Sequence, residues 1–477
     1  MIRLTKIELD GVKNIRHGAL DLGTLDNGGS ITGIYGQNGS GKTSVIEAIQ
    51  VLRHLMAGGS LVGDQTGILV SKNEGNHSAT LSTKIQIEED DGTTYTAVYT
   101  AVLEPCDTGL HVAHETLAMK PKDGRLHTLV DYEMAKDAET GLLTPRVTPS
   151  GAWNSLTALQ HGDELLRQEA ALAYSQNRSL LFSPEFTTQF TRISATLHAQ
   201  NTLPSIRQTA LERNLDPLLD LIEKLSRFAR DGIRVVTTRQ GASVCFGYTP
   251  FIHGGRFDIL DLERPRFVPS QIQHEIERMV EQANLVLPVV IPGLTLKCEM
   301  KEDVGDNGEA GARVFLYSLR NCVQIPFWAE SEGIRRIVGI LSLLVRMFNE
   351  TDTCIAIDEI DSGIFEVLLG DILRTLAQRG CGQLIFTAHN LRVLEVLDHK
   401  SIVFSTSDSN NRFVPVTNVR AGNNLRDMYI RMVNIGTDGA QLADKVKPSH
   451  VAAALADAGK VTGKAGDEGC EVVYSFC

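Results

Sequence analysis

Eight residues near the N-terminus, GQNGSGKT from Gly36 to Thr43, constrain the fold of this chain more than any other segment. An apolar run from Ile31 to Tyr35 precedes them, and an amphipathic helix pattern follows. A strand, a glycine-rich loop and a helix in this order form a P-loop, whose backbone N–H groups turn inward around the phosphates of a nucleotide. The segment therefore predicts an α/β core with a nucleotide site between a strand and a helix.

Single residues of this loop have separate roles in such a site. Lys42 is expected to place a cation over the phosphates, and the hydroxyl of Thr43 is suited to ligate Mg²⁺. The helix that begins near Gly41 adds the positive end of its dipole. The predicted nucleotide-binding residues of the loop are Gly36, Asn38, Gly39, Ser40, Gly41, Lys42, Thr43 and Ser44.

A second predicted strand, far downstream, ends in two carboxylates. Four apolar residues from Cys354 to Ile357 are followed directly by Asp358 and Glu359. This pattern is typical of a buried parallel strand that presents acids at its C-terminal end. We expect Asp358 to hold Mg²⁺ and Glu359 to act as the general base on the attacking water. An ordinary core strand followed by an acidic loop is the alternative, and the P-loop favours the catalytic interpretation.

Two further segments have features that a nucleotide site can use. The strand pattern from Leu384 to Thr387 is followed by His389, which could contact the γ-phosphate. Ser331 and Gly333 precede an apolar helix pattern from Ile334 to Phe348, where Ser331 is a candidate N-cap and Gly333 permits close backbone approach. Taken alone, an ordinary polar histidine and an ordinary capped core helix would also explain these residues.

The order of these motifs resembles that of ATP-binding-cassette ATPases, and more closely that of their SMC/RecF/OLD-like branch, which includes AAA family ATP-binding proteins of bacterial antiphage defence. The resemblance covers roughly the first 60 residues and roughly residues 315 to 435. It departs from the transporter pattern through a very large insertion before Ser331 and through the lack of a clear Q-loop, for which Gln65 is a candidate. The matching segments are Ile2–Leu9 with Gly11–Ile15, GQNGSGKTS, ESEGIRR at Glu330–Arg336, AIDEIDSG at Ala356–Gly363 and TAHN at Thr387–Asn390.

The resemblance implies a site shared between two chains. In ATPases of this type the signature segment of one subunit caps ATP on the P-loop of another, so Ser331 and Gly333 would contact the ATP of a partner chain, with Asp361 in the D-loop. A homodimer or a higher even oligomer is then expected. The resemblance also implies that ATP-driven dimerisation controls a separate protein effector, in antiphage defence.

The sequence can also be compared with the patterns of three other functions. A RecF-like ATPase that binds DNA in repair or maintenance is the main alternative. A nuclease is disfavoured because the sequence shows no Toprim-type carboxylate set and no His-Asn-His cluster, and a sensor that never hydrolyses ATP is disfavoured by Glu359. The net charge of −12 provides no general basic field for nucleic acid, although a local basic face stays possible.

Cysteine usage and hydropathy indicate the compartment. The eight cysteines form no Cys-x-x-Cys pair, which argues against a zinc ribbon or hook and suits a reducing cytosol. The longest apolar run, Ile337 to Val345, is too short to span a bilayer, and the N-terminus has no apolar signal core. We expect a cytoplasmic protein with no membrane partner.

Periodicity suggests how the chain is divided. Alternation from Ala79 to Leu103 around Asp90-Asp91-Gly92 predicts an antiparallel meander, and residues 151–230 predict helices without heptads. The basic stretch Arg227–Arg230 with Arg234 is interpreted as a solvated charged face. The predicted fold class is α/β, a P-loop NTPase head of ABC type with a mixed sheet, an antiparallel β meander and a helical insertion. The predicted parts are a first ATPase lobe at 1–57, an insertion at 58–312, a second part of the lobe at 313–435 and a C-terminal tail at 436–477.

Overall fold

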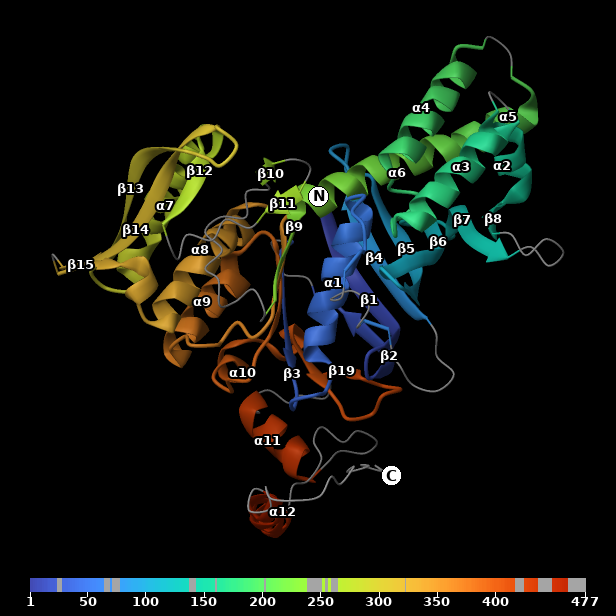
Figure 1. The fold of residues 1–477 in the computed structure, drawn as a ribbon. Helices are drawn as coiled ribbons and strands as arrows, with labels where there is room; N and C mark the ends of the chain where they lie inside the picture. The colour runs from blue at the N-terminus through green and yellow to red at the C-terminus, as the bar shows by residue number, and fades with distance from the viewer. Residues whose placement is uncertain are drawn as a thin grey trace, which may run out of the picture.

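The structure is a computed structural model, and a sheet of six strands forms its centre (Figure 1). The strands follow the order β19-β18-β3-β17-β16-β9, and all neighbours are parallel except β18 and β19. Every residue of β3, β9, β16, β17 and β18 is buried, as expected for a parallel sheet covered on both faces. The strands are β3 (Ser30–Tyr35), β9 (Ile233–Val236), β16 (Cys354–Ile357), β17 (Gln383–Thr387), β18 (Ile402–Ser405) and β19 (Phe413–Pro415). The residues described are 1–23, 28–63, 69–70, 78–136, 143–158, 161–200, 203–237, 251–253, 256–258, 265–321, 323–416, 424–435 and 448–461.

A second, antiparallel sheet of seven strands contains the predicted meander. Its order is β2-β1-β4-β5-β6-β7-β8, so the chain's first two strands extend the meander instead of the parallel sheet. The predicted hairpin is confirmed, with Glu88 opposite Thr94 across the turn. Buried and partly buried positions alternate along β4 and β5, which is the pattern of a sheet with one face on the core. The strands are β1 (Ile2–Val12), β2 (Ile15–Asp21), β4 (Ala79–Glu88), β5 (Thr94–Cys106), β6 (Gly109–Pro121), β7 (His127–Lys136) and β8 (Leu143–Thr148).

Helix α1 (Lys42–Met56) lies between these two sheets (Figure 1). The apolar face expected from the sequence, Val45, Ile49, Leu52 and Met56, is completely buried. It belongs to the same hydrophobic core as residues of β1, β4, β9 and β17. The P-loop helix is therefore held on both sides, and its N-terminus is fixed at one edge of the parallel sheet.

The helical part of the chain sits on the meander at the upper right of Figure 1. Its helices are α2 (Ser150–Thr157), α3 (Gly162–Ser175), α4 (Pro184–His198), α5 (Ser205–Ala210) and α6 (Asp216–Arg227), with π-helical turns at Leu211–Leu215 and Phe228–Gly232. The second π-helical turn leads straight into β9, so the predicted insertion contributes a strand to the core sheet. The predicted solvated charged face is confirmed only in part. Arg227 and Arg230 are exposed, as predicted. Arg234 lies on β9 with 2% of its surface exposed, not on a solvated face, because its guanidinium donates to the carbonyls of Arg230 and Ile233.

A third, smaller sheet precedes the signature segment. It has the order β12-β14-β13 with β15 beside β14, and α7 packs against it. The elements are β10 (Phe251–His253), β11 (Arg256–Asp258), β12 (Arg266–Pro269), α7 (Ser270–Val290), β13 (Leu294–Val304), β14 (Ala310–Arg320) and β15 (Val323–Pro326). Strands β10 and β11 form a separate two-stranded ribbon.

Helices α8 and α9 cover the other face of the parallel sheet. Their apolar residues share a core with Ile355, Ile357 and Leu384 of that sheet. The remaining elements are a 3₁₀ turn at Phe327–Ala329, α8 (Glu332–Asn349), α9 (Glu366–Arg379), α10 (Val393–Val396), a 3₁₀ turn at His399–Ser401, α11 (Leu425–Ile435) and α12 (Pro448–Val461). Among the described helices, none is both long and apolar enough to cross a membrane.

Candidate nucleotide site

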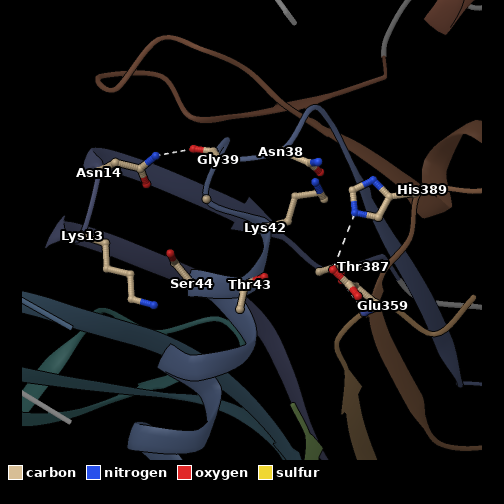
Figure 2. Close-up of a pocket in the computed structure, with 11 residues that line it drawn as sticks. Lys13, Asn14, Asn38, Gly39, Lys42, Thr43, Ser44, Glu359, Thr387 and His389 are labelled. Carbon is tan, nitrogen blue, oxygen red and sulfur yellow. Dashed lines mark hydrogen bonds and ion pairs between the residues drawn. The ribbon is translucent and has the colours of Figure 1, made fainter. Parts of the chain in front are cut away.

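A pocket of about 430 Å³ opens where the N-terminus of α1 meets the C-terminal ends of β16 and β17 (Figure 2). This is the edge of a parallel sheet at which ligands of α/β proteins bind. The pocket brings together residues from the two predicted parts of the ATPase lobe, 1–57 and 313–435. Its lining consists of Lys13, Asn14, Asn38, Gly39, Gly41, Lys42, Thr43, Ser44, Glu359, Thr387 and His389.

The P-loop backbone has the form that the sequence predicts. Gly39 and Gly41 have φ angles of 80° and 88°, in the left-handed region that favours glycine. A Cβ on Gly36 would lie 2.1 Å from Ser405 Oγ, so the start of the loop is packed against the end of β18. Ser40 is also buried, and its hydroxyl bonds to Ser405 and to the Gln37 carbonyl. Gly36 and Ser40 therefore shape the loop from outside the pocket.

Lys42 is buried at the base of this loop. Its Nζ atom donates to the carbonyls of Gly36 at 2.9 Å and Gln37 at 3.0 Å, and 6% of the residue is exposed. Burial lowers the pKa of Lys42, while the charges of Asp358, Glu359 and Asp361 oppose that shift. A buried cation that donates to neutral carbonyls is well suited to exchange them for phosphate oxygens.

The predicted magnesium ligands contact one another. Thr43 Oγ1 donates to Asp358 Oδ1 at 3.2 Å, and Asp358 is fully buried. A hydroxyl and a carboxylate are hard oxygen ligands that suit Mg²⁺, which takes its remaining ligands from phosphates and water. Within the described residues, no group of three or more His, Cys, Asp or Glu side chains could hold a metal ion. The residues present therefore fit Mg²⁺ together with a phosphate ligand.

Thr387, at the end of β17, was missed as a functional residue from the sequence. Its hydroxyl donates to Asp358 Oδ1 at 2.6 Å and accepts the Glu359 N–H at 2.7 Å. One hydroxyl thus positions both acids of the Asp-Glu pair. The strand pairing that brings it there, Ile357 beside Phe386, could not be deduced from either strand alone.

Glu359 and His389 lie next to each other on one side of the pocket, opposite Lys13 and Asn14 (Figure 2). Their Oε1 and Nε2 atoms are 3.9 Å apart, and both side chains are partly open to solvent. Glu359 has a φ angle of 47°, an uncommon conformation for a residue with a side chain and one that is found at functional sites. Asp361 does not line the pocket. Its Oδ2 accepts the N–H groups of His389 at 2.8 Å and Asn390 at 2.6 Å, so it fixes the loop that holds His389.

The signature residues lie outside the pocket. Ser331 is exposed and is the N-cap of α8, as predicted, since its Oγ accepts the Ile334 N–H at 3.4 Å. Gly333 makes its close backbone approach to the chain itself, because a Cβ there would lie 2.1 Å from the Gly363 carbonyl oxygen. Another residue of the same helix, Arg336, donates to the backbone carbonyls of Asp358 at 2.8 Å and Glu359 at 3.3 Å.

Two more pocket residues come from the turn between β1 and β2. Asn14 donates from its Nδ2 to the Gly39 carbonyl, and Lys13 pairs with Glu47 of α1. The only signal for them in the sequence was the resemblance of the segment GVKNI to a family pattern, which assigned them no role. The Q-loop candidate Gln65 lies outside the described residues.

Comparison with known proteins gives one match in sequence and several in structure. The family model of an AAA domain matches residues 6–121. A search of curated proteins finds no match. Among solved structures, an Smc head bound to the C-terminal winged-helix domain of ScpA is 14% identical, with 87% of this chain and 97% of that chain covered and a TM-score of 0.42. The SMC head domain from Thermotoga maritima is 14% identical, with 87% and 100% covered and a TM-score of 0.32. The recombination mediator RecF is 11% identical, with 85% and 96% covered and a TM-score of 0.34.

The AAA-domain match begins in β1 and runs through the P-loop and α1 into β6. The same P-loop shares a pocket with Glu359 and His389, and Thr43 bonds to Asp358 at the pocket floor. Residues 6–121 thus match an AAA domain, and the geometry around them is that of a P-loop nucleotide site.

Proposed function

We propose that this protein binds ATP with Mg²⁺ and hydrolyses it. The observation that carries the proposal is the content of one pocket: a buried lysine, a hydroxyl bonded to a buried carboxylate, and a glutamate facing a histidine. These are the groups that positioning and charge stabilisation of a transferring phosphoryl group require.

Each group has a part in the reaction that its position supports. The N–H groups at the start of α1 and Lys42 hold the β- and γ-phosphates. Thr43 and Asp358 hold Mg²⁺, which neutralises phosphate charge when bound. Glu359 accepts the proton of the attacking water, and His389 faces both Glu359 and the space for the γ-phosphate.

We also propose that ATP acts as a switch by joining two copies of this chain. Ser331 is exposed at the N-terminus of α8 and is not part of its own chain's pocket, so it is available to cap the nucleotide of a second copy. ATP would then join two heads and hydrolysis would release them. Control of a separate effector protein, in antiphage defence, is the role we propose for that cycle on the basis of the sequence resemblance.

The test of hydrolysis is the substitution Glu359→Gln. It keeps the shape of the side chain but removes the base, so steady-state turnover should fall by about 10²- to 10⁴-fold while ATP affinity stays near that of the wild type. The matched control is Glu302→Gln, an exposed acid on β13, which should turn over ATP normally. Wild-type turnover by Glu359→Gln would rule out Glu359 as the base.

A further inference from the structure

Two large aromatic side chains are exposed close to the signature segment, one along the chain and one next to the loop that packs on Gly333. Trp328 lies three residues before Ser331 and is 58% exposed. Phe365 lies two residues after Gly363, whose carbonyl packs against Gly333. Its side chain is 69% exposed. The residues directly before them, Phe327 and Ile364, are 0% and 6% exposed. The backbone is thus anchored in the core while both aromatic rings point outward.

Nothing in the local structure requires aromatic residues at these positions. Phe365 is the N-cap residue of α9 and makes no side-chain capping bond, although Ser, Thr, Asp and Asn are the residues that stabilise this position. Trp328 occupies the middle of a single 3₁₀ turn whose buried residue is Phe327. Exposed tryptophan and phenylalanine are enriched at the centres of protein interfaces, where tryptophan in particular carries binding energy.

We propose that Trp328 and Phe365 are the apolar anchors by which the signature edge of one chain docks on the P-loop edge of a second copy. The inference rests on the proposed function, and it adds the residues that hold the two heads together. A second copy is favoured because Ser331, which lies between the two aromatic residues in sequence, is exposed and does not line the nucleotide pocket of its own chain.

The charges on the two edges are complementary, which also favours a second copy. The signature edge carries the exposed acids Glu332 and Glu366, and the first hairpin, beside the P-loop, carries the exposed Arg16 near the start of β2. A head-to-tail pair of chains places opposite charges around the two aromatic anchors. Such a rim sets the orientation of the partners, whereas the buried aromatic rings provide the affinity.

Tryptophan fluorescence gives a direct readout of this docking, because the chain has only two tryptophans. Trp153 is 1% exposed, so quenching by acrylamide reports on Trp328, which is 58% exposed. In the Glu359→Gln protein, ATP with Mg²⁺ should reduce the quenching at least about twofold and shift the emission to the blue, as docking covers Trp328. The same protein with Trp328→Phe should lose the ATP-dependent change, and the variant with Lys42→Ala should show none.

The strength of the contact is measured by sedimentation in the same Glu359→Gln background. Trp328→Ala and Phe365→Ser should each raise the dissociation constant of the ATP-bound dimer by about 10- to 30-fold, as interface anchors do, with ATP binding to the monomer unchanged. The control is Leu285→Ala, which removes an apolar side chain that is 78% exposed on α7.

The possible results separate the anchors from the switch. An ATP-bound dimer in which acrylamide still quenches Trp328 fully would contradict the proposed role of Trp328 as an anchor. The proposed ATP-driven dimerisation would be unaffected by that result. ATP binding without a dimer would overturn the proposed switch, and the inference with it. A blue shift in a protein that remains monomeric would mean that Trp328 is covered by its own chain, which also contradicts the inference.

Discussion

The P-loop half of the proposed nucleotide site and its proposed signature half are built differently. In the P-loop half, Lys42 bonds to two carbonyls of its own loop and Thr43 bonds to Asp358. In the signature half, Ser331 is exposed, and its hydroxyl accepts the N–H of Ile334, in the helix that it caps, at 3.4 Å. The P-loop residues thus bond to other residues of the pocket, whereas Ser331 lies on the surface outside it.

The two halves are nevertheless joined inside one chain. Arg336 extends from the signature helix to the backbone of Asp358 and Glu359, and Gly333 packs against the loop that follows them. A close packing contact and two hydrogen bonds therefore connect the N-terminal part of α8 to Asp358 and Glu359 of the same chain. A displacement of α8 would be transmitted to the acids of its own pocket, whichever chain Ser331 contacts.

The largest effect is expected from Lys42→Ala, which breaks the P-loop half alone. Each hydrogen bond to a charged group contributes about 1.5–3 kcal/mol, so loss of the lysine should raise the dissociation constant for ATP by at least about 100-fold. Isothermal calorimetry measures this directly. Lys301→Ala, which removes an exposed lysine on β13, should bind ATP as the wild type does. An unchanged affinity in Lys42→Ala would show that the phosphates bind elsewhere.

The next effect concerns the signature half. Ser331→Asp keeps a good N-cap residue but adds a negative charge that would face the γ-phosphate on a second chain, so turnover should be nearly lost while ATP binding survives. Ser331→Asn is the neutral control and should retain most of the activity. We prefer this position to Gly333, where any Cβ collides with the Gly363 carbonyl of the same chain and disturbs the fold as well.

Mixing two inactive variants sharpens the comparison between the halves. A heterodimer of Lys42→Ala and Ser331→Asp chains contains one site with an intact P-loop and an intact signature, so an equimolar mixture should recover about a quarter of wild-type turnover if chains pair at random. No recovery in a mixture that demonstrably contains heterodimers would place the signature in the pocket of its own chain.

The smallest effect is expected from Thr387→Val, which keeps the shape of the side chain but removes the hydroxyl that positions both acids. Turnover should fall by about 10-fold, and the free energy of unfolding should drop by about 1–3 kcal/mol, because buried hydrogen-bonding groups lose their partner. Thr387→Ser should restore both turnover and stability. Full turnover in Thr387→Val would mean that Asp358 and Glu359 are positioned without this hydroxyl.

The parts of the site that could be predicted are those that a short segment specifies by itself. The P-loop, the Asp358-Glu359 pair and the N-cap Ser331 each depend on residues a few positions apart, and the structure confirms the loop, the strand and the cap. The hairpin around Asp90-Asp91-Gly92 is confirmed for the same reason.

The parts that could not be predicted depend on contacts between distant segments. Thr387 reaches Asp358 only when β16 and β17 pair in register, and Asn14 reaches Gly39 only when the first hairpin folds over the P-loop. The strand β9 has only four residues, too few to show an alternation of buried and exposed positions. It also follows α6 and a π-helical turn without a loop between them. For Gly333 the sequence indicates a close approach but does not reveal that the partner is Gly363.

The position of β9 limits how this protein can be shortened. Strand β9 covers one edge of β16, and the Val236 carbonyl accepts the N–H of Asp358 at 2.8 Å. A truncated protein that joined residue 57 to residue 313 would delete β9 and leave β16, four buried apolar residues, as an open sheet edge. Unprotected edges of this kind pair with other chains, so such a protein should aggregate instead of yielding a minimal ATPase. A shortened protein would therefore have to keep β9 beside β16.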